Sequence, residues 1–259
     1  MLSIDLNCDM GEGMATDEAI FPFISSANIA CGGHAGDTAS MRRTVGLAVR
    51  HNVAIGAHPS YPDRAGFGRT DILETMAGKG DRALRLSDLA QILADQIGHL
   101  QTVCREFGTR LHHVKPHGAL YNRAAKDDAV SEIICRVVTE ADRSLFLYGL
   151  SGSGMRLRAA AAGLRFVSEV FADRTYCADG GLTPRTEPDA LIHDPDLMLA
   201  QVLMMVGERQ IRAGDGTMVP IAADTICLHG DGEQAVAFAT TIRSELDRTG
   251  IIVRSPAAF

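Results

Sequence analysis

Short apolar segments alternate with longer amphipathic segments along the whole chain, and this alternation limits the possible folds more than any other feature. Helical periodicity is clearest over 87–107, where apolar residues recur at three- and four-residue steps. Strands joined by helices are typical of right-handed crossovers in a parallel sheet. The pattern predicts strands over 3–8, 27–30, 53–57, 111–115, 145–148, 165–170 and 225–228, and helices over 38–51, 87–107, 127–141, 154–162, 195–209 and 233–249.

The chain has the size of one barrel domain. Its 259 residues contain no low-complexity linker and no internal repeat. None of the predicted strands is followed by the G-x-G-x-x-G turn of a dinucleotide-binding sheet, so the pattern favours a closed β/α barrel. We therefore expect a single α/β barrel domain over residues 1–259, with 59–85 and 171–188 as long functional loops.

Charge and composition exclude several classes of protein. The chain has 25 Lys and Arg against 32 Asp and Glu, a net charge of −7 without a basic run, which argues against nucleic-acid or anionic-membrane binding. No apolar stretch approaches the ~18 residues of a membrane span, and the first residues lack a signal-peptide pattern. The six cysteines form no C-x-x-C pair, which is typical of reduced thiols. These features predict a cytoplasmic protein.

Polar residues gather where the predicted strands end. The first strand carries Asp5, Asn7 and Asp9 on one face, so these side chains point toward the interior of a barrel. The carboxyl ends of parallel strands meet on one face, where barrel enzymes build their active sites. The sequence therefore predicts an active site at this end. Later strand ends contribute Asn28, His34, His58, Lys115, His117, Asp173, Arg174 and His229.

Four of the nine histidines are candidate metal ligands. His34, His58, His117 and His229 each stand beside Gly or Pro at a predicted strand end. Imidazole and carboxylate ligands suit zinc or manganese. However, no H-x-x-x-H or comparable spacing groups these residues, so the sequence alone assigns no metal.

Seven sequence blocks connect the chain with a known family. They are Asp5–Glu12, Ser26–Gly32 with His34–Asp37, Val53–Pro59, Pro62–Arg69, His113–Gly118, Glu169–Arg174 and Ile226–Asp231. In these blocks the chain resembles the LamB/YcsF family, the lactam-utilisation proteins. The match runs in order from about residue 3 to residue 254, so it covers nearly the whole chain.

The resemblance implies a fold and a reaction. The expected fold is an irregular seven-stranded β/α barrel of the kind that polysaccharide deacetylases share. The expected reaction is the ATP-dependent opening of 5-oxo-L-proline to L-glutamate, together with two further subunits, B and C. The chain has no nucleotide-binding loop, since Met155 follows Gly149–Gly154 where a P-loop requires Lys. We therefore expect the partner subunits to handle most of the ATP and Mg²⁺ chemistry, and this barrel to hydrolyse an activated lactam.

Within that reaction, the strand-end residues receive hypothetical roles. Asp9 or His58 is the general base that activates water. Lys115 and His117 stabilise the developing oxyanion or the departing phosphate, and Asp173 holds an imidazole or the substrate nitrogen. The substrate-binding candidates are Arg64 and Arg174, which pair with the substrate carboxylate, and Asn7, Asn28, His34 and His229, which orient the substrate.

Two other functions stay open. A stand-alone metal-dependent amide or acetyl hydrolase would carry zinc or manganese and lose activity with a chelator. A non-catalytic subunit would bind an acidic metabolite for a partner, so that replacing His58, Lys115 or His117 would change affinity but not turnover. The density of ionisable groups at the strand ends favours an enzyme subunit.

Overall fold

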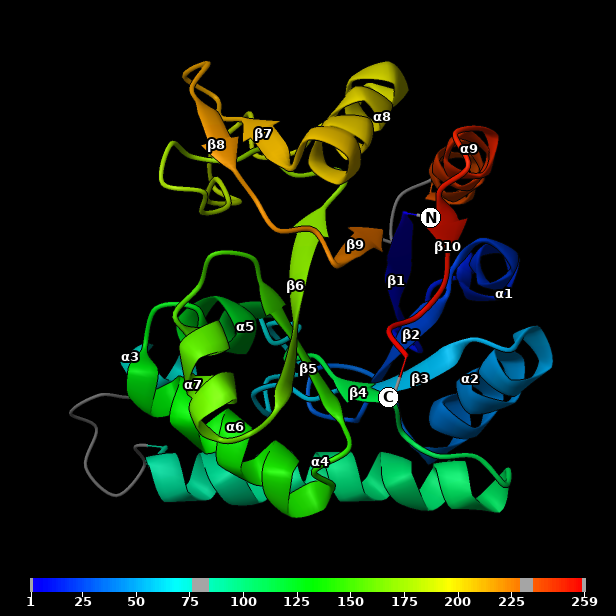
Figure 1. The fold of residues 1–259 in the computed structure, drawn as a ribbon. Helices are drawn as coiled ribbons and strands as arrows, with labels where there is room; N and C mark the ends of the chain where they lie inside the picture. Colours follow the sequence, from blue (N-terminus) through cyan, green and yellow to red (C-terminus); the bar gives the residue numbers. More distant parts are fainter. Residues whose placement is uncertain (1, 76–83, 229–234, 258–259) are drawn as a thin grey trace.

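Seven parallel strands close into a barrel. The computed structural model describes residues 2–75, 84–228 and 235–257. An eighth strand, β10 (Ile252–Val253), pairs with the first residues of β1 outside the ring. The predicted seven-stranded barrel is therefore confirmed (Figure 1). Its strands pair in the order β1 (Ser3–Met10), β2 (Ser26–Ala30), β3 (Ala54–His58), β4 (His113–Val114), β5 (Phe146–Leu150), β6 (Arg165–Phe171) and β9 (Thr225–Leu228), and β9 pairs back with β1.

Amphipathic helices cover the outside of the barrel. They begin close to the positions that the sequence predicts. In α2, α6 and α8 an Asp side chain caps the first turn, and in α6 Asp127 accepts hydrogen bonds from two backbone N–H groups. The predicted helix over 195–209 is shorter and continues as a π-helical turn, η3 (Met204–Glu208). The covering helices are α2 (Thr38–His51), α4 (Leu86–Glu106), α6 (Asp128–Ala141), α7 (Met155–Ala161), α8 (Pro195–Leu203) and α9 (Ala235–Arg248).

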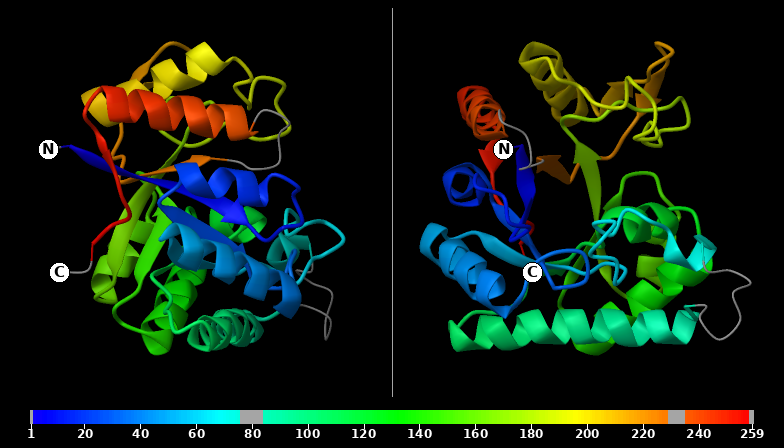
Figure 2. Two further views of the ribbon diagram at one scale, coloured as in Figure 1. Left: turned by 90° about the vertical axis from the view of Figure 1, so that its right-hand side faces the viewer. Right: turned by 180° about the vertical axis from the view of Figure 1, so that it is seen from behind.

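Several short elements are absent from the sequence prediction, because they are too short to display a full hydrophobic period. The hairpin of β7 (Gln210–Arg212) and β8 (Met218–Pro220) lies with α8 at the carboxyl end of β6 (Figure 2). The short helices are α1 (Asp17–Ile20), η1 (Phe21–Phe23), α3 (Ile72–Thr75) and α5 (Gly118–Ala124).

The two faces of β1 are buried in different surroundings. Ile4, Leu6, Cys8 and Met10 belong to the apolar core. The alternate residues face polar groups of other strands, as the contacts of Asp5 and Asn7 show. Barrel interiors are more often filled by branched apolar residues. The polar side chains of this barrel interior therefore need hydrogen-bond partners on neighbouring strands. Among the described helices, none is both long and apolar enough to cross a membrane.

Asp5 closes the amino end of the polar interior. Hydroxyl groups of Ser25, Ser26, Tyr148 and Thr225 donate to its carboxylate over 2.6 to 2.9 Å. Burial raises the pKa of Asp5, and the hydroxyl groups partly oppose this shift.

We expect Asp5→Ala to destabilise the barrel. The substitution removes the shared acceptor of four hydroxyl groups, three of them buried, which costs about 3 kcal/mol of unfolding free energy. Urea denaturation measures this loss. Asp95→Ala, which removes an exposed carboxylate on α4, serves as the control and should change stability by less than about 0.5 kcal/mol. Equal stability of the two variants would contradict this role of Asp5.

Candidate functional site

A cavity of about 540 Å³ opens at the carboxyl ends of the strands. Five predicted site residues line it: Asp9, His58, Lys115, His117 and Arg174. They come from β1, β3, the segment after β4 and the loop after β6, so the barrel brings together residues that are far apart in the sequence. An apolar part of the wall is formed by Tyr121, Leu150 and Phe171. The cavity therefore combines an apolar surface with ionisable groups, as small-molecule sites do.

Lys115 is the centre of a buried ion network. Its Nζ lies 2.9 Å from Asp9 Oδ1 and 2.7 Å from Glu169 Oε1, and it also donates to Asn7 Oδ1 and Cys227 Sγ. Burial alone would lower the pKa of Lys115, but neighbouring groups, Asp9 foremost, raise it well above its ordinary value. Lys115 therefore stays protonated, and its charge stabilises the buried carboxylate of Glu169 and the partly exposed one of Asp9.

Two asparagines lie beneath the cavity and fix these charges. Asn28 Nδ2 donates to Asn7 Oδ1 at 2.7 Å and to Asp9 Oδ1 at 2.8 Å. Asn7 Nδ2 in turn donates to Glu169 Oε1 at 3.0 Å. Both asparagines are fully buried and absent from the cavity wall. They therefore orient Asp9 and Glu169.

Backbone carbonyls fix the tautomers of two histidines. His58 Nδ1 lies 2.8 Å from the Lys115 carbonyl, and His117 Nε2 lies 2.9 Å from the Phe67 carbonyl. Because a carbonyl oxygen only accepts, each of these nitrogens carries a proton. In the neutral rings, the lone pairs of His58 Nε2 and His117 Nδ1 then face each other at 2.9 Å. Two lone pairs at this distance require a proton or a cation to hold them together.

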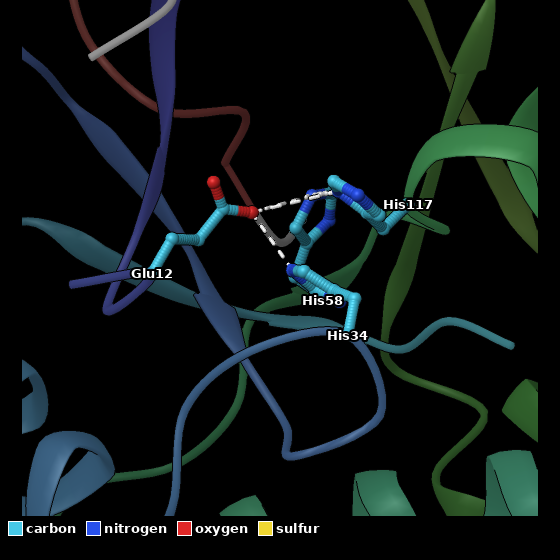
Figure 3. Close-up of side chains that lie close together, drawn as sticks. All are labelled: Glu12, His34, His58 and His117. Atoms are coloured by element: carbon cyan, nitrogen blue, oxygen red, sulfur yellow. Dashed lines mark hydrogen bonds and ion pairs between the residues drawn. The ribbon is translucent and has the colours of Figure 1, made fainter. Parts of the chain in front are cut away.

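Glu12 and His34 complete this cluster (Figure 3). Glu12 Oε1 lies 2.8 Å from His34 Nε2, 3.5 Å from His117 Nδ1 and 3.9 Å from His58 Nε2. The His34 and His117 rings are stacked with centroids 3.6 Å apart. Gly68 permits this stacking, because a Cβ there would lie 2.9 Å from both histidines.

The donor set of Glu12, His34, His58 and His117 fits a divalent metal. One potential ligand atom from each residue lies within 4.8 Å of the others. Burial lowers the pKa of His34 and of His117 to about 3, so both rings are neutral and can ligate. Carbonyls that hold the outer nitrogens of His58 and His117 are the usual support of metal-binding imidazoles.

The structure places the other predicted residues outside this cluster. Arg64 is exposed and donates to the carbonyls of Gly32 and Gly36, so it is not brought to the cavity wall. Asp173 is half-buried and likewise absent from the wall. Arg174 lines the cavity while it donates to the Ala190 and Thr183 carbonyls. His229 lies outside the described residues.

Three site residues were not among the sequence candidates. Glu12 lies on the loop after β1, and Glu169 is fully buried within β6. Tyr121 on α5 lines the cavity beside Glu169, and burial together with that carboxylate raises its pKa well above the ordinary value. Glu12 and Glu169 each occur in one of the sequence blocks that resemble the family. The hydrophobic periodicity of the chain did not single out either residue as a candidate.

Comparison with known proteins identifies the family of this chain. The LamB/YcsF family matches residues 4–259. The chain belongs to the LamB/YcsF family. A relative from Bordetella parapertussis, named as the A subunit of 5-oxoprolinase, is 50% identical over 260 residues, which cover 98% of each chain. The resemblance seen in the sequence blocks is therefore confirmed.

Solved structures with similar folds include a lactam utilization protein and a deacetylase. The lactam utilization protein from Thermus thermophilus is 38% identical and superposes with a TM-score of 0.87 over the full length of both chains. The catalytic domain of a peptidoglycan N-acetylglucosamine deacetylase from Eubacterium rectale has a TM-score of 0.53 at 9% identity, covering 99% of this chain and 89% of that chain. The second likeness shows the deacetylase-like barrel fold alone.

Proposed function

We propose that this chain is the A subunit of a 5-oxoprolinase, the hydrolase that opens 5-oxo-L-proline to L-glutamate. The supporting observation is the convergence of Asp9, His58, Lys115 and His117 on one cavity, in a chain 50% identical to a protein of that name over 98% of both lengths. Opening an unstrained lactam is unfavourable and needs ATP. Because the sequence has no nucleotide-binding loop, subunits B and C use ATP and Mg²⁺ to activate the lactam, and this barrel hydrolyses it.

Asp9 is the general base in this proposal. Its side chain is about 15% exposed at the cavity, whereas that of His58 is 1% exposed and directs Nε2 toward His117 and Asp9. Asp9 takes a proton from water as the water oxygen bonds to the lactam carbon. The proton then passes to the ring nitrogen as the carbon–nitrogen bond breaks. Lys115 Nζ lies 2.9 Å from Asp9 Oδ1 and holds that carboxylate in position at the cavity.

Donors around the cavity bind and polarise the substrate. Tyr121 stays protonated and can donate a hydrogen bond, while the apolar wall of Leu150 and Phe171 accommodates the ring methylenes. Arg174 pairs with the substrate carboxylate, because a guanidinium on the cavity wall matches that group in charge and shape. Asn7 and Asn28 act indirectly, through Asp9 and Glu169.

A divalent metal would be held by Glu12, His34, His58 and His117. When bound, such an ion polarises a carbonyl oxygen and stabilises negative charge. The same cluster supports a second candidate function, a stand-alone metal-dependent amide hydrolase. That alternative requires activity without ATP or partners.

The deciding experiment measures glutamate release from 5-oxoproline by this chain with ATP and Mg²⁺, with and without subunits B and C. We expect release only in the mixture. Release by the chain alone, without ATP, would favour the stand-alone hydrolase. If folded proteins released no glutamate either with or without subunits B and C, both functions would be contradicted.

A cytoplasmic location forms part of this proposal. The described cysteines, Cys8, Cys31, Cys104, Cys135, Cys177 and Cys227, are all free. Free thiols suit a reducing compartment, where ATP is also available.

A further inference from the structure

A row of residues crosses four neighbouring strands of the barrel and ends at Asp9. The register of the sheet pairs Asp9 of β1 with Asn28 of β2, Asn28 with Gly56 of β3, and Gly56 with His113 of β4. Asp9 lines the cavity, whereas His113 is fully buried and absent from the cavity wall. The row therefore connects the proposed general base with a histidine that has no role in the mechanism described above.

The missing side chain of Gly56 lets His113 reach across β3 to Asn28. A Cβ at Gly56 would lie 2.1 Å from His113 Nε2, so the imidazole occupies the space above this glycine. Nε2 lies 2.7 Å from Asn28 Oδ1, two strands away from β4. The backbone of Gly56 does not itself require glycine, because its φ is not positive. Glycine at this position therefore provides the space that the imidazole fills.

The surrounding hydrogen bonds fix the orientation of the Asn28 amide. Lys115 Nζ donates to Asn7 Oδ1 at 3.2 Å, so this oxygen is an acceptor. Asn28 Nδ2 donates to the same oxygen and to Asp9 Oδ1. Asn28 Oδ1 then faces His113, and because an amide oxygen only accepts, His113 Nε2 carries a proton. Without this donor the amide could turn and direct its oxygen, instead of its N–H groups, toward Asp9.

The ring of His113 is itself held in place by its neighbours. It stacks on Tyr148 with centroids 4.0 Å apart and planes 15° apart, and the Tyr148 hydroxyl donates to Asp5. On the other side of the imidazole, Nδ1 lies 3.1 Å from Nδ1 of His112. A proton bound between these two atoms leaves the Nε2–H group unchanged. The Nε2–H group of His113 is therefore a fixed donor to Asn28.

We propose that His113 is a positioning residue for the hydrolysis, because it fixes the Asn28 amide that in turn orients the Asp9 carboxylate. The inference rests on the proposed function, in which Asp9 takes a proton from water. Asn28 and Lys115 both donate to Oδ1 of Asp9, so these two contacts determine the direction of its other oxygen, Oδ2. His113 lies outside the cavity and acts only through Asn28.

Three replacements of His113 separate this role from packing. Glutamine can place an amide N–H close to the position of Nε2, whereas asparagine is one methylene shorter and leucine has no donor. In glutamate release by the chain with subunits B and C, His113→Leu and His113→Asn should lower kcat by about 10²-fold and change KM by less than about twofold. His113→Gln should keep kcat within about tenfold of wild type. A packing role predicts the opposite order, since buried leucine avoids the desolvation cost of buried glutamine.

Gly56→Ala tests the same contact without removing a hydrogen-bonding group. The added Cβ displaces the imidazole from Asn28, so kcat should fall to about the level of His113→Leu, again with little change in KM. His193→Leu replaces an exposed histidine outside the barrel interior and should retain wild-type kcat and KM. Wild-type kcat in His113→Leu, or equal kcat in His113→Leu and His113→Gln, would overturn the inference.

Nitrogen NMR of the chain alone, labelled in its histidine rings, gives a readout without activity. We expect an Nε2–H group that exchanges slowly with water, whose signal disappears in His113→Gln and exchanges faster in Asn28→Ala. A His113 ring protonated on Nδ1 alone would overturn the inference. If the wild-type mixture releases no glutamate, the proposed function fails, whereas the contact between His113 and Asn28 is still decided by this spectrum.

Discussion

Replacing Lys115 with Met should abolish activity and destabilise the barrel at the same time. The substitution leaves Asp9 and Glu169 facing each other without the cation that lies within 2.9 Å of both. Breaking a buried ion pair by removal of one partner costs about 3–5 kcal/mol. Loss of a preorganised cation from the site should lower kcat/KM by about 10³-fold. Urea denaturation measures the first effect, and glutamate release by the assembled subunits measures the second.

A second variant separates stability from catalysis. In Lys115→Met with Glu169→Gln, one buried charge is removed along with its partner, so we expect part of the lost stability to return while activity stays low. Arg143→Met, which replaces an exposed cation far from the cavity, is the matched control for both measurements. Wild-type activity in either Lys115 variant would show that the network is structural only.

The polar alternation of β1 explains why much of the site could be predicted. Asp5, Asn7 and Asp9 occupy one face of a strand whose other face is apolar, and a period of two places such residues in the barrel interior. Strand ends of a parallel barrel converge, so the presence of His58, Lys115 and His117 near Asp9 followed from topology.

Other site contacts depend on loop geometry that no sequence period encodes. Glu12 reaches the histidines because Gly11 and Gly13, at φ 74° and 91°, turn the chain after β1. Glu169 is a charged residue inside a buried strand, and its partner Lys115 follows a different strand. Arg64 illustrates the converse, since its long side chain turns to the loop carbonyls of Gly32 and Gly36. The charge of a residue and its position along a strand therefore predict where a site lies. Which residues contact that site depends on the conformation of the loops and side chains.

The histidine cluster should bind one divalent ion, and Glu12→Gln should weaken that binding by at least about 100-fold. His58 Nε2 and His117 Nδ1 face each other at 2.9 Å with their protons held on the far side of each ring. The Glu12 carboxylate supplies the negative charge that favours a cation over a shared proton. Titration of the metal-free chain with Zn²⁺ and with Mn²⁺, in competition with a chelating dye, gives the affinities directly.

Thermal unfolding gives a readout that does not depend on activity. At a free metal concentration of 100 times Kd, binding to the folded state adds about 2.7 kcal/mol to the unfolding free energy, and Glu12→Gln or His58→Ala should lose most of that increment. His193→Ala removes an exposed histidine outside the cluster and should behave as wild type. If neither metal stabilises the wild-type chain, or if Glu12→Gln binds as tightly as His193→Ala, the lone pairs must instead share a proton. The cluster would then act in proton transfer beside Asp9.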